Sequence, residues 1–183
     1  MKTLVIKYRY FLKFVLTFSL TYIAFLAAYK LYLDYSTGDI YYPDFFTDLV
    51  SRHCQYFFEL LNYNIQLIDH PKEASIKVIF ENKYVARIIE GCNSVSTIML
   101  FMSFVIAFAD NFKSTFLFLI FGCILIYLVN LIRIVILTIW IYYYPMQIDI
   151  SHDIVFPLII YGTVVLLWMI WVNRFNKIYR DNE

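Results

Sequence analysis

Apolar residues are gathered into four long runs that polar segments separate. The runs are approximately Phe11–Leu33, Val95–Ala109, Ser114–Tyr142 and Ile154–Val172. A helix needs roughly 20 apolar residues to cross a bilayer. The second run is short, and it reaches across only if it includes Cys92 to Thr97 or if the bilayer thins locally. The pattern therefore predicts an all-α polytopic membrane protein with about four transmembrane helices, at 11–33, 92–109, 114–142 and 154–172.

The segment 34–91 separates the first two runs and lacks the pattern of a further span. In PDFFTDLVSRHCQYFFELLN, one helical face gathers the apolar side chains and one histidine, namely Phe46, Leu49, Val50, His53, Phe57, Leu60 and Leu61. This periodicity predicts an extracytoplasmic amphipathic helix on the outer leaflet. Alternating residues then predict a short β-hairpin before the second span, with strands Ser75–Phe80 and Tyr84–Ile89. The chain, 1–183, is predicted to be a single membrane domain.

Basic residues at the ends of the runs predict the orientation. They flank the start of the first run, the turn before the third and the end of the fourth, at Lys2, Lys7, Arg9, Lys13, Lys113, Arg174, Lys177 and Arg180. The loop YYPMQIDISHD has neither lysine nor arginine. Because positive residues remain on the cytoplasmic side, both termini are expected in the cytoplasm and the segment 34–91 outside. The first run resembles a cleavable signal peptide in part, but its length and its bulky aromatics favour a retained anchor helix.

Composition narrows the class of protein. Of the 183 residues, 62% are hydrophobic and 16% are charged, and the net charge is +1. This apolar share is well above that of a soluble domain, and no basic surface for nucleic acid is present. The three cysteines, Cys54, Cys92 and Cys123, lack metal-ligand spacing, so neither a metal nor a cofactor is expected. The sequence leaves a Cys54–Cys92 disulfide open.

Three side chains of different chemistry are predicted to share one depth at the outer face. Cys92 starts the second span. Arg133 lies about 28 Å along a helix counted from Ser114, near the far limit of a hydrocarbon core about 30 Å thick. His152 stands just before the fourth span. Alone, each has a structural explanation: a small helix-start residue, an arginine that snorkels to lipid phosphate, a solvated histidine. Their shared depth favours a functional site.

These side chains suit nucleophilic catalysis. A helix N-terminus or a nearby cation lowers the pKa of a cysteine, and the thiolate is the attacking species, so Cys92 is the candidate nucleophile. His152 titrates near physiological pH and is the candidate general acid and base. Arg133 is the candidate for oxyanion stabilisation or substrate orientation. Two supporting residues are expected: Asn130, one helical turn before Arg133, and Asn93, a capping residue of the second span.

The segments EGCNSVSTIMLFMSFVIAF, NLIRIVIL and HDIVFP, in this order, resemble the exosortase/archaeosortase family of membrane cysteine transpeptidases. The resemblance covers roughly Val78 to Trp171, and the small size and the EGCNS segment are most similar to the exosortase F type of Bacteroidetes. It implies that Cys92, Arg133 and His152 form the catalytic set. The sequence Cys92-Asn93-Ser94 departs from the Cys-Ser-Gly or Cys-Ala-Gly of many members.

The resemblance also implies the partner and the reaction. The substrate would be a membrane-anchored protein with a C-terminal sorting signal, cut at the outer face of the inner membrane and transferred to an acceptor. The alternative from another class is a non-enzymatic membrane scaffold or assembly factor of an envelope secretion or sorting system, in which the outer helix and hairpin carry the function. A transporter is disfavoured because the spans lack paired charges at the midplane.

Overall fold

The computed structural model describes residues 8–36, 42–109, 111–147 and 154–180. The elements, in chain order, are α2 (Arg9–Ser36), α3 (Phe45–Leu60), β1 (Ile65–Asp69), β2 (Ser75–Phe80), β3 (Lys83–Ile89), the 3-10 turn η1 (Glu90–Cys92), α4 (Val95–Ala107), α5 (Phe112–Tyr143), the 3-10 turn η2 (Pro145–Gln147) and α7 (Phe156–Arg180). The described chain is therefore mostly helical, with one small sheet.

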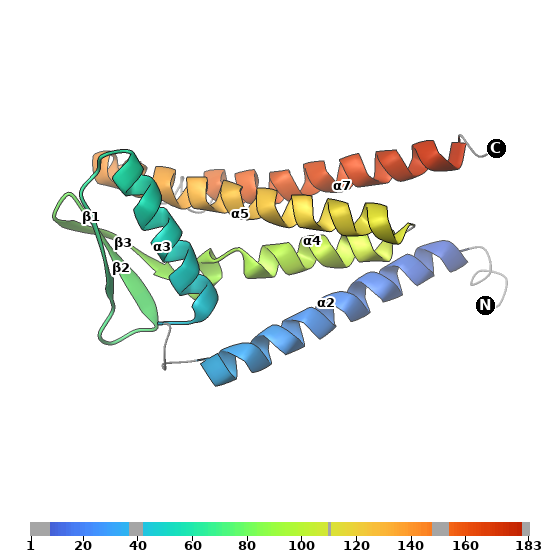
Figure 1. Ribbon diagram of the computed structural model, residues 1–183, viewed down its shortest axis with the longest axis horizontal. Coiled ribbons are helices and arrows are strands. Elements are labelled where there is room, and N and C mark those ends of the chain that lie inside the picture. The colour runs from blue at the N-terminus through green and yellow to red at the C-terminus, as the bar shows by residue number, and fades with distance from the viewer. Residues whose placement is uncertain (1–7, 37–41, 110, 148–153, 181–183) are drawn as a thin grey trace.

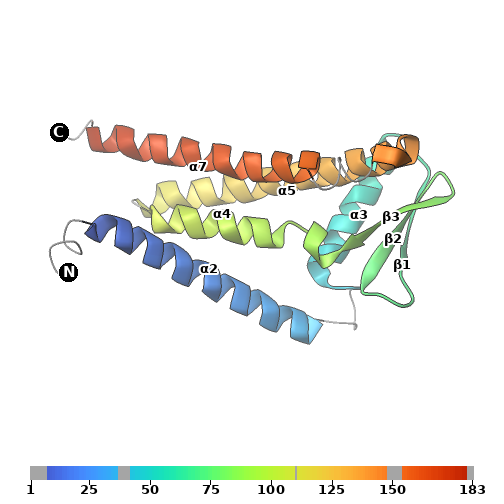
Figure 2. The ribbon, with the colours of Figure 1, turned by 180° about the vertical axis from the view of Figure 1, so that it is seen from behind.

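The long helices run alongside one another, and α3 and the sheet lie together at one end of them (Figure 1). Helix α4 is central, since it packs against α2, α5 and α7. The view from behind shows that α2 and α5 begin, and α4 and α7 end, at the end away from the sheet (Figure 2). The basic residues Arg9, Lys113 and Arg174 belong to these helix ends, so the arrangement agrees with the up-and-down order that the charges predict.

Three helices are long and apolar enough to cross a membrane: Arg9–Ser36, Phe112–Tyr143 and Pro157–Arg174. The span predicted at 92–109 corresponds to α4, an apolar helix of only 13 residues. At 1.5 Å per residue it is about 20 Å long, which is shorter than the hydrocarbon core. The prediction of candidate spans is confirmed for three helices, and the fourth falls short because Cys92, Asn93 and Ser94 precede the helix instead of extending it.

The predicted hairpin is present, but it belongs to a three-stranded antiparallel sheet with the order β1-β2-β3. Its turn residues Glu81 and Asn82 both have positive φ, as a tight two-residue hairpin turn requires. The third strand, β1, was not predicted. Its five residues, IQLID, form too short an alternation to stand out before pairing with β2 gives them partners.

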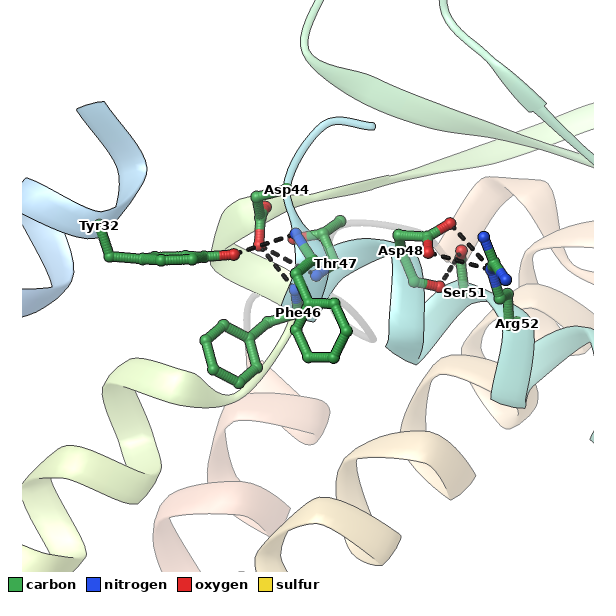
Figure 3. Close-up of polar contacts among 8 residues, drawn as sticks. Tyr32, Asp44, Phe46, Thr47, Asp48, Ser51 and Arg52 are labelled. Carbon is green, nitrogen blue, oxygen red and sulfur yellow. Dashed lines mark hydrogen bonds and ion pairs between the residues drawn. The ribbon is translucent and has the colours of Figure 1, made fainter. Parts of the chain in front are cut away.

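Helix α3 covers the sheet and the C-terminal half of α5. Its N-cap is Asp44, whose carboxylate accepts hydrogen bonds from the backbone N–H of Phe46 (3.0 Å) and Thr47 (3.1 Å), as Figure 3 shows. The buried residues of the helix are Thr47, Val50, Ser51, Cys54 and Phe58. Of the apolar face that the periodicity predicts for the outer leaflet, only Val50 is buried within the fold, and the contact of the rest with the leaflet stays a prediction.

Two clusters of buried side chains hold the fold together. One joins α3, the sheet and the C-terminal half of α5, and the other joins α4, α5 and α7. In the second cluster Gly122 of α5 faces the ring of Phe101 of α4 so closely that an added Cβ would lie 2.1 Å from it. Phe101 is fully buried. Helices α4 and α5 therefore approach each other to a distance that only glycine permits.

Candidate active site

Cys92 lies in the connection between the sheet and α4. Strand β3 ends at Ile89, η1 carries Cys92 as its last residue, and Ser94 adopts the left-handed conformation (φ 62°) before α4 begins at Val95. The left-handed residue reverses the chain within one position. The cysteine is partly buried, and it sits on a turn, not inside a helix, as an accessible nucleophile needs.

Asn93 fixes the turn from the side of the helices. It is 3% exposed, and its Oδ1 accepts a hydrogen bond of 2.9 Å from the backbone N–H of Val95, the first residue of α4, although the N-cap position itself is Ser94. Its side-chain amide donates to the hydroxyls of Tyr29 (2.8 Å) and Thr47 (3.3 Å). One buried amide thus ties α2, α3 and the start of α4 together beside the cysteine.

Asn130 fixes the turn from the side of α5. Its side-chain N–H donates to the backbone carbonyl of Cys92 at 2.8 Å, and its Oδ1 lies 3.5 Å from Nη1 of Arg133. Asn130 is 1% exposed, so both contacts are shielded from water. A single side chain therefore links the cysteine turn and the guanidinium, which come from different elements.

Cys92 and Arg133 line one cavity of about 210 Å³ between the sheet and α5. Its other walls are mainly apolar: Val78, Val85, Ala86, Ile88, Ile134, Leu137 and Ile141, with Thr138 and Arg87. The Nε of Arg133 is buried and has no hydrogen-bond partner among the described residues. An unsatisfied buried donor of a charged group is costly, so the guanidinium of Arg133 has hydrogen-bonding capacity that the described residues do not use.

The third predicted residue, His152, lies outside the described residues. Helix α5 ends at Tyr143 and α7 begins at Phe156. The structure brings Cys92, Arg133, Asn130 and Asn93 into one neighbourhood.

The remaining thiols and histidines have other surroundings. Cys54 is 1% exposed and shares the sheet-side cluster with Cys92, and both are free thiols. Burial, with a smaller contribution from Cys92 nearby, raises the pKa of Cys54 to about 12, so this thiol is not a nucleophile at neutral pH. His53 Nδ1 lies 2.6 Å from the hydroxyl of Tyr127. Within the described ranges, no three metal-ligating side chains come together.

One residue of the cavity was missed from the sequence. Arg87, on β3, lines the same cavity as Cys92 and forms an ion pair with Glu73. The one feature of the sequence that could have indicated Arg87 is its position five residues before Cys92, on the strand that leads to it. A strand residue points to one face or the other only once its register is known, and a bulge in this strand makes that register hard to predict.

The family model of transmembrane exosortases (Exosortase_EpsH) matches residues 12–173. Because this match extends over most of the chain, the protein belongs to the transmembrane exosortase family. Neither a curated protein nor a solved structure matches the chain. The family membership agrees with a multi-pass membrane protein, and the assignment to the F type stays a prediction.

Proposed function

We propose that the protein is a membrane cysteine peptidase or transpeptidase that cleaves the C-terminal sorting signal of a membrane-anchored protein. The observation that carries the proposal is that Cys92 and Arg133 line one cavity in a chain of the transmembrane exosortase family. The family match supports the processing of sorting signals, and the cavity offers a thiol and a guanidinium to one substrate group.

In the proposed reaction, the thiolate of Cys92 attacks the scissile carbonyl and forms a tetrahedral intermediate. Arg133, which lines the same cavity, donates to the oxyanion through its guanidinium group. Collapse breaks the C–N bond, the amine leaves with a proton from His152, and a thioester remains on Cys92. An acceptor amine or water then attacks the thioester after giving its proton to His152.

Asn130 is proposed as a positioning residue. Its two contacts, to the carbonyl of Cys92 and to Arg133, set the distance between the nucleophile and the oxyanion donor before substrate arrives. Such pre-organisation lowers the barrier, because no reorganisation is needed when charge develops on the substrate. Asn93 supports the same turn from the opposite side.

The proposal places the cavity at the outer face of the inner membrane, with both termini in the cytoplasm. The supporting observation is that the basic ends of the helices lie at the end away from the sheet. A substrate helix in the membrane beside α4 would then present its outer end at the level of Cys92.

The experiment is the processing of a co-expressed substrate, followed by mass spectrometry of its new C-terminus. Cys92→Ala, Cys92→Ser, Arg133→Ala and His152→Ala are each expected to abolish or strongly reduce processing. Cys123→Ala is the matched control, because that thiol lies on α5 in the other cluster of the fold, away from the cavity. Full processing by the Cys92→Ala protein would end the catalytic proposal and favour the scaffold.

A further inference from the structure

Strand β3 is an edge of the sheet. It pairs with β2 on one side, and on the other side the described residues provide no strand, turn or loop whose backbone bonds to it. Exposed edges normally invite pairing with another chain, and proteins usually protect them. This edge leads, through η1, directly to Cys92.

The cavity lies between this edge strand and α5, with Val78 of the neighbouring strand β2 also in its lining. One wall consists of four consecutive residues of β3, Val85 to Ile88, and the opposite wall contains Arg133, Leu137 and Ile141 of α5, each one turn after the last. Eight helical residues span about 12 Å, which equals the length of about four residues of extended chain. Cys92 lines the same cavity.

The dimensions of the cavity decide what it can hold. A helix with side chains is about 10 Å across, so about 210 Å³ cannot accept one. An extended chain needs less space in the cavity. Its backbone bonds to the strand edge, and its side chains point alternately to the two faces of the sheet, so only every second side chain enters the cavity. The apolar walls suit side chains of moderate size such as valine.

We propose that the edge of β3 binds an extended segment of the substrate as a fourth strand, with alternate side chains in the cavity and the scissile bond at Cys92. The proposal rests on the proposed function and adds the mode of substrate binding. The substrate residues before the scissile bond come from outside the membrane and run toward the cysteine, as β3 does, so the added strand is parallel to β3.

The bulge in β3 limits where this strand pairs. Val85 has no partner on β2, whereas Ala86 to Ile89 pair in regular register. A bulge twists the edge and disturbs regular pairing. The regular part of the edge is thus the four residues nearest η1. We therefore expect the backbone of about four substrate residues to be recognised.

The test uses an acetylated tetrapeptide vinyl sulfone of alternating valine and threonine, with methyl vinyl sulfone as the reagent without a peptide. In both reagents the thiolate Sγ of Cys92 adds to the alkene carbon β to the sulfonyl group, the carbon–carbon π bond breaks, and the carbon next to the sulfone takes a proton from water. The labelling rate is followed by intact mass on the full chain in detergent, in a Cys123→Ala background.

The tetrapeptide reagent is expected to label Cys92 at least about tenfold faster than methyl vinyl sulfone. Methylating its backbone nitrogens one at a time should slow labelling about tenfold at every second position, because only those N–H groups bond to β3. The intervening positions should change the rate less than twofold. Equal effects at all positions, or no acceleration by the peptide, would overturn the pairing.

Protein variants provide a second comparison. Leu137→Trp fills the cavity and should remove the acceleration by the peptide, measured as the ratio of the tetrapeptide rate to the methyl vinyl sulfone rate in the same variant. Ile136→Trp is the matched control, since Ile136 is exposed on the other face of α5 and should leave both rates unchanged. An equal response of both variants would contradict a cavity that holds substrate side chains.

Hydrogen exchange separates failure of the pairing from failure of the proposed function. If methyl vinyl sulfone does not label Cys92, the nucleophile is wrong. The pairing is then decided on the full-length Cys92→Ala protein with the tetrapeptide as its amide. Slower exchange at alternate amides of β3 supports the added strand, and unchanged exchange at saturating peptide rejects it. Protection of β3 without any peptide, dependent on protein concentration, identifies a second copy as the occupant and also rejects it.

Discussion

The side-chain amide of Asn130 donates a 2.8 Å hydrogen bond to the backbone carbonyl of Cys92, a residue 38 positions earlier in the chain. The contact joins the middle of the longest helix to the turn that carries the thiol. Because Asn130 is also 3.5 Å from Arg133 through its other atom, the position of the turn and that of the guanidinium depend on one side chain.

Asn130→Ala should therefore lower both stability and the reactivity of Cys92. The variant leaves a carbonyl and a guanidinium N–H without a partner, which costs about 1–3 kcal/mol in the free energy of unfolding. We expect the labelling rate of Cys92 to fall and its pH profile to shift, as measured by intact mass over a pH series. Ser103→Ala is the control: this buried hydroxyl bonds only within its own helix, to the carbonyl of Met99. An unchanged pH profile in Asn130→Ala would remove the positioning role.

Gly122→Ala should destabilise the protein. The added methyl group would lie 2.1 Å from the buried ring of Phe101, so α4 and α5 must move apart, and overpacking of this kind costs about 1–3 kcal/mol. Gly162→Ala is the matched control, because nothing lies within 4 Å of its added Cβ in α7. Alanine there should stabilise the helix by about 0.5–1 kcal/mol. Thermal unfolding in detergent measures both changes in stability. Gly122→Ala should lower the unfolding temperature and Gly162→Ala should raise it. Shifts of the same sign would contradict the close packing of α4 against α5.

The thiol of Cys54 should make stability fall at alkaline pH. Burial raises its pKa to about 12, whereas cysteine in an unfolded chain titrates near about 8.5. Between these values the folded state holds a proton that the unfolded state has lost, so the free energy of unfolding decreases as pH rises, by up to about 1.4 kcal/mol per unit. The difference between wild type and Cys54→Ala at pH 8 and pH 10 measures this slope. A difference that does not change with pH would show that the thiol is not shielded.

Asp44→Ala should weaken α3. The carboxylate caps the helix through the N–H groups of Phe46 and Thr47, and removal of such a cap costs about 1–2 kcal/mol (Figure 3). Asp44→Asn keeps an acceptor oxygen in the same place and should cost less. Hydrogen exchange at Phe46 and Thr47 reports the cap directly, and equal exchange in the two variants would show that the carboxylate does not hold the helix.

Much of the fold follows from patterns that are local in the sequence. Long apolar runs determine α2, α5 and α7, and alternation together with two residues of positive φ at the turn defines the β2–β3 hairpin. Cys92 and Arg133 are predicted to lie at one depth in the membrane, because a helix rises by a constant distance per residue. The structure has both in the wall of one cavity. Their roles in catalysis stay a prediction.

The rest depends on contacts between distant segments. Strand β1 becomes a strand by pairing with β2, and α3 buries Thr47, Ser51 and Cys54 against its neighbours, which its apolar periodicity does not indicate. The start of α4 was predicted too early because Ser94 takes a left-handed conformation that the sequence does not announce. The turn before α4 is held by Asn93, whose side-chain amide donates hydrogen bonds to the hydroxyls of Tyr29 and Thr47, 64 and 46 residues away in the chain.

The shortness of α4 has a consequence for the lipids around the protein. Thirteen residues, about 20 Å, stand at the centre of a bundle whose other helices have 25 or more. Acyl chains that reach α4 between its neighbouring helices must shorten, tilt or end early, so the protein should prefer phospholipids with short or unsaturated tails. The thickness of the host membrane would therefore determine how far the Cys92 thiol lies below the lipid headgroups.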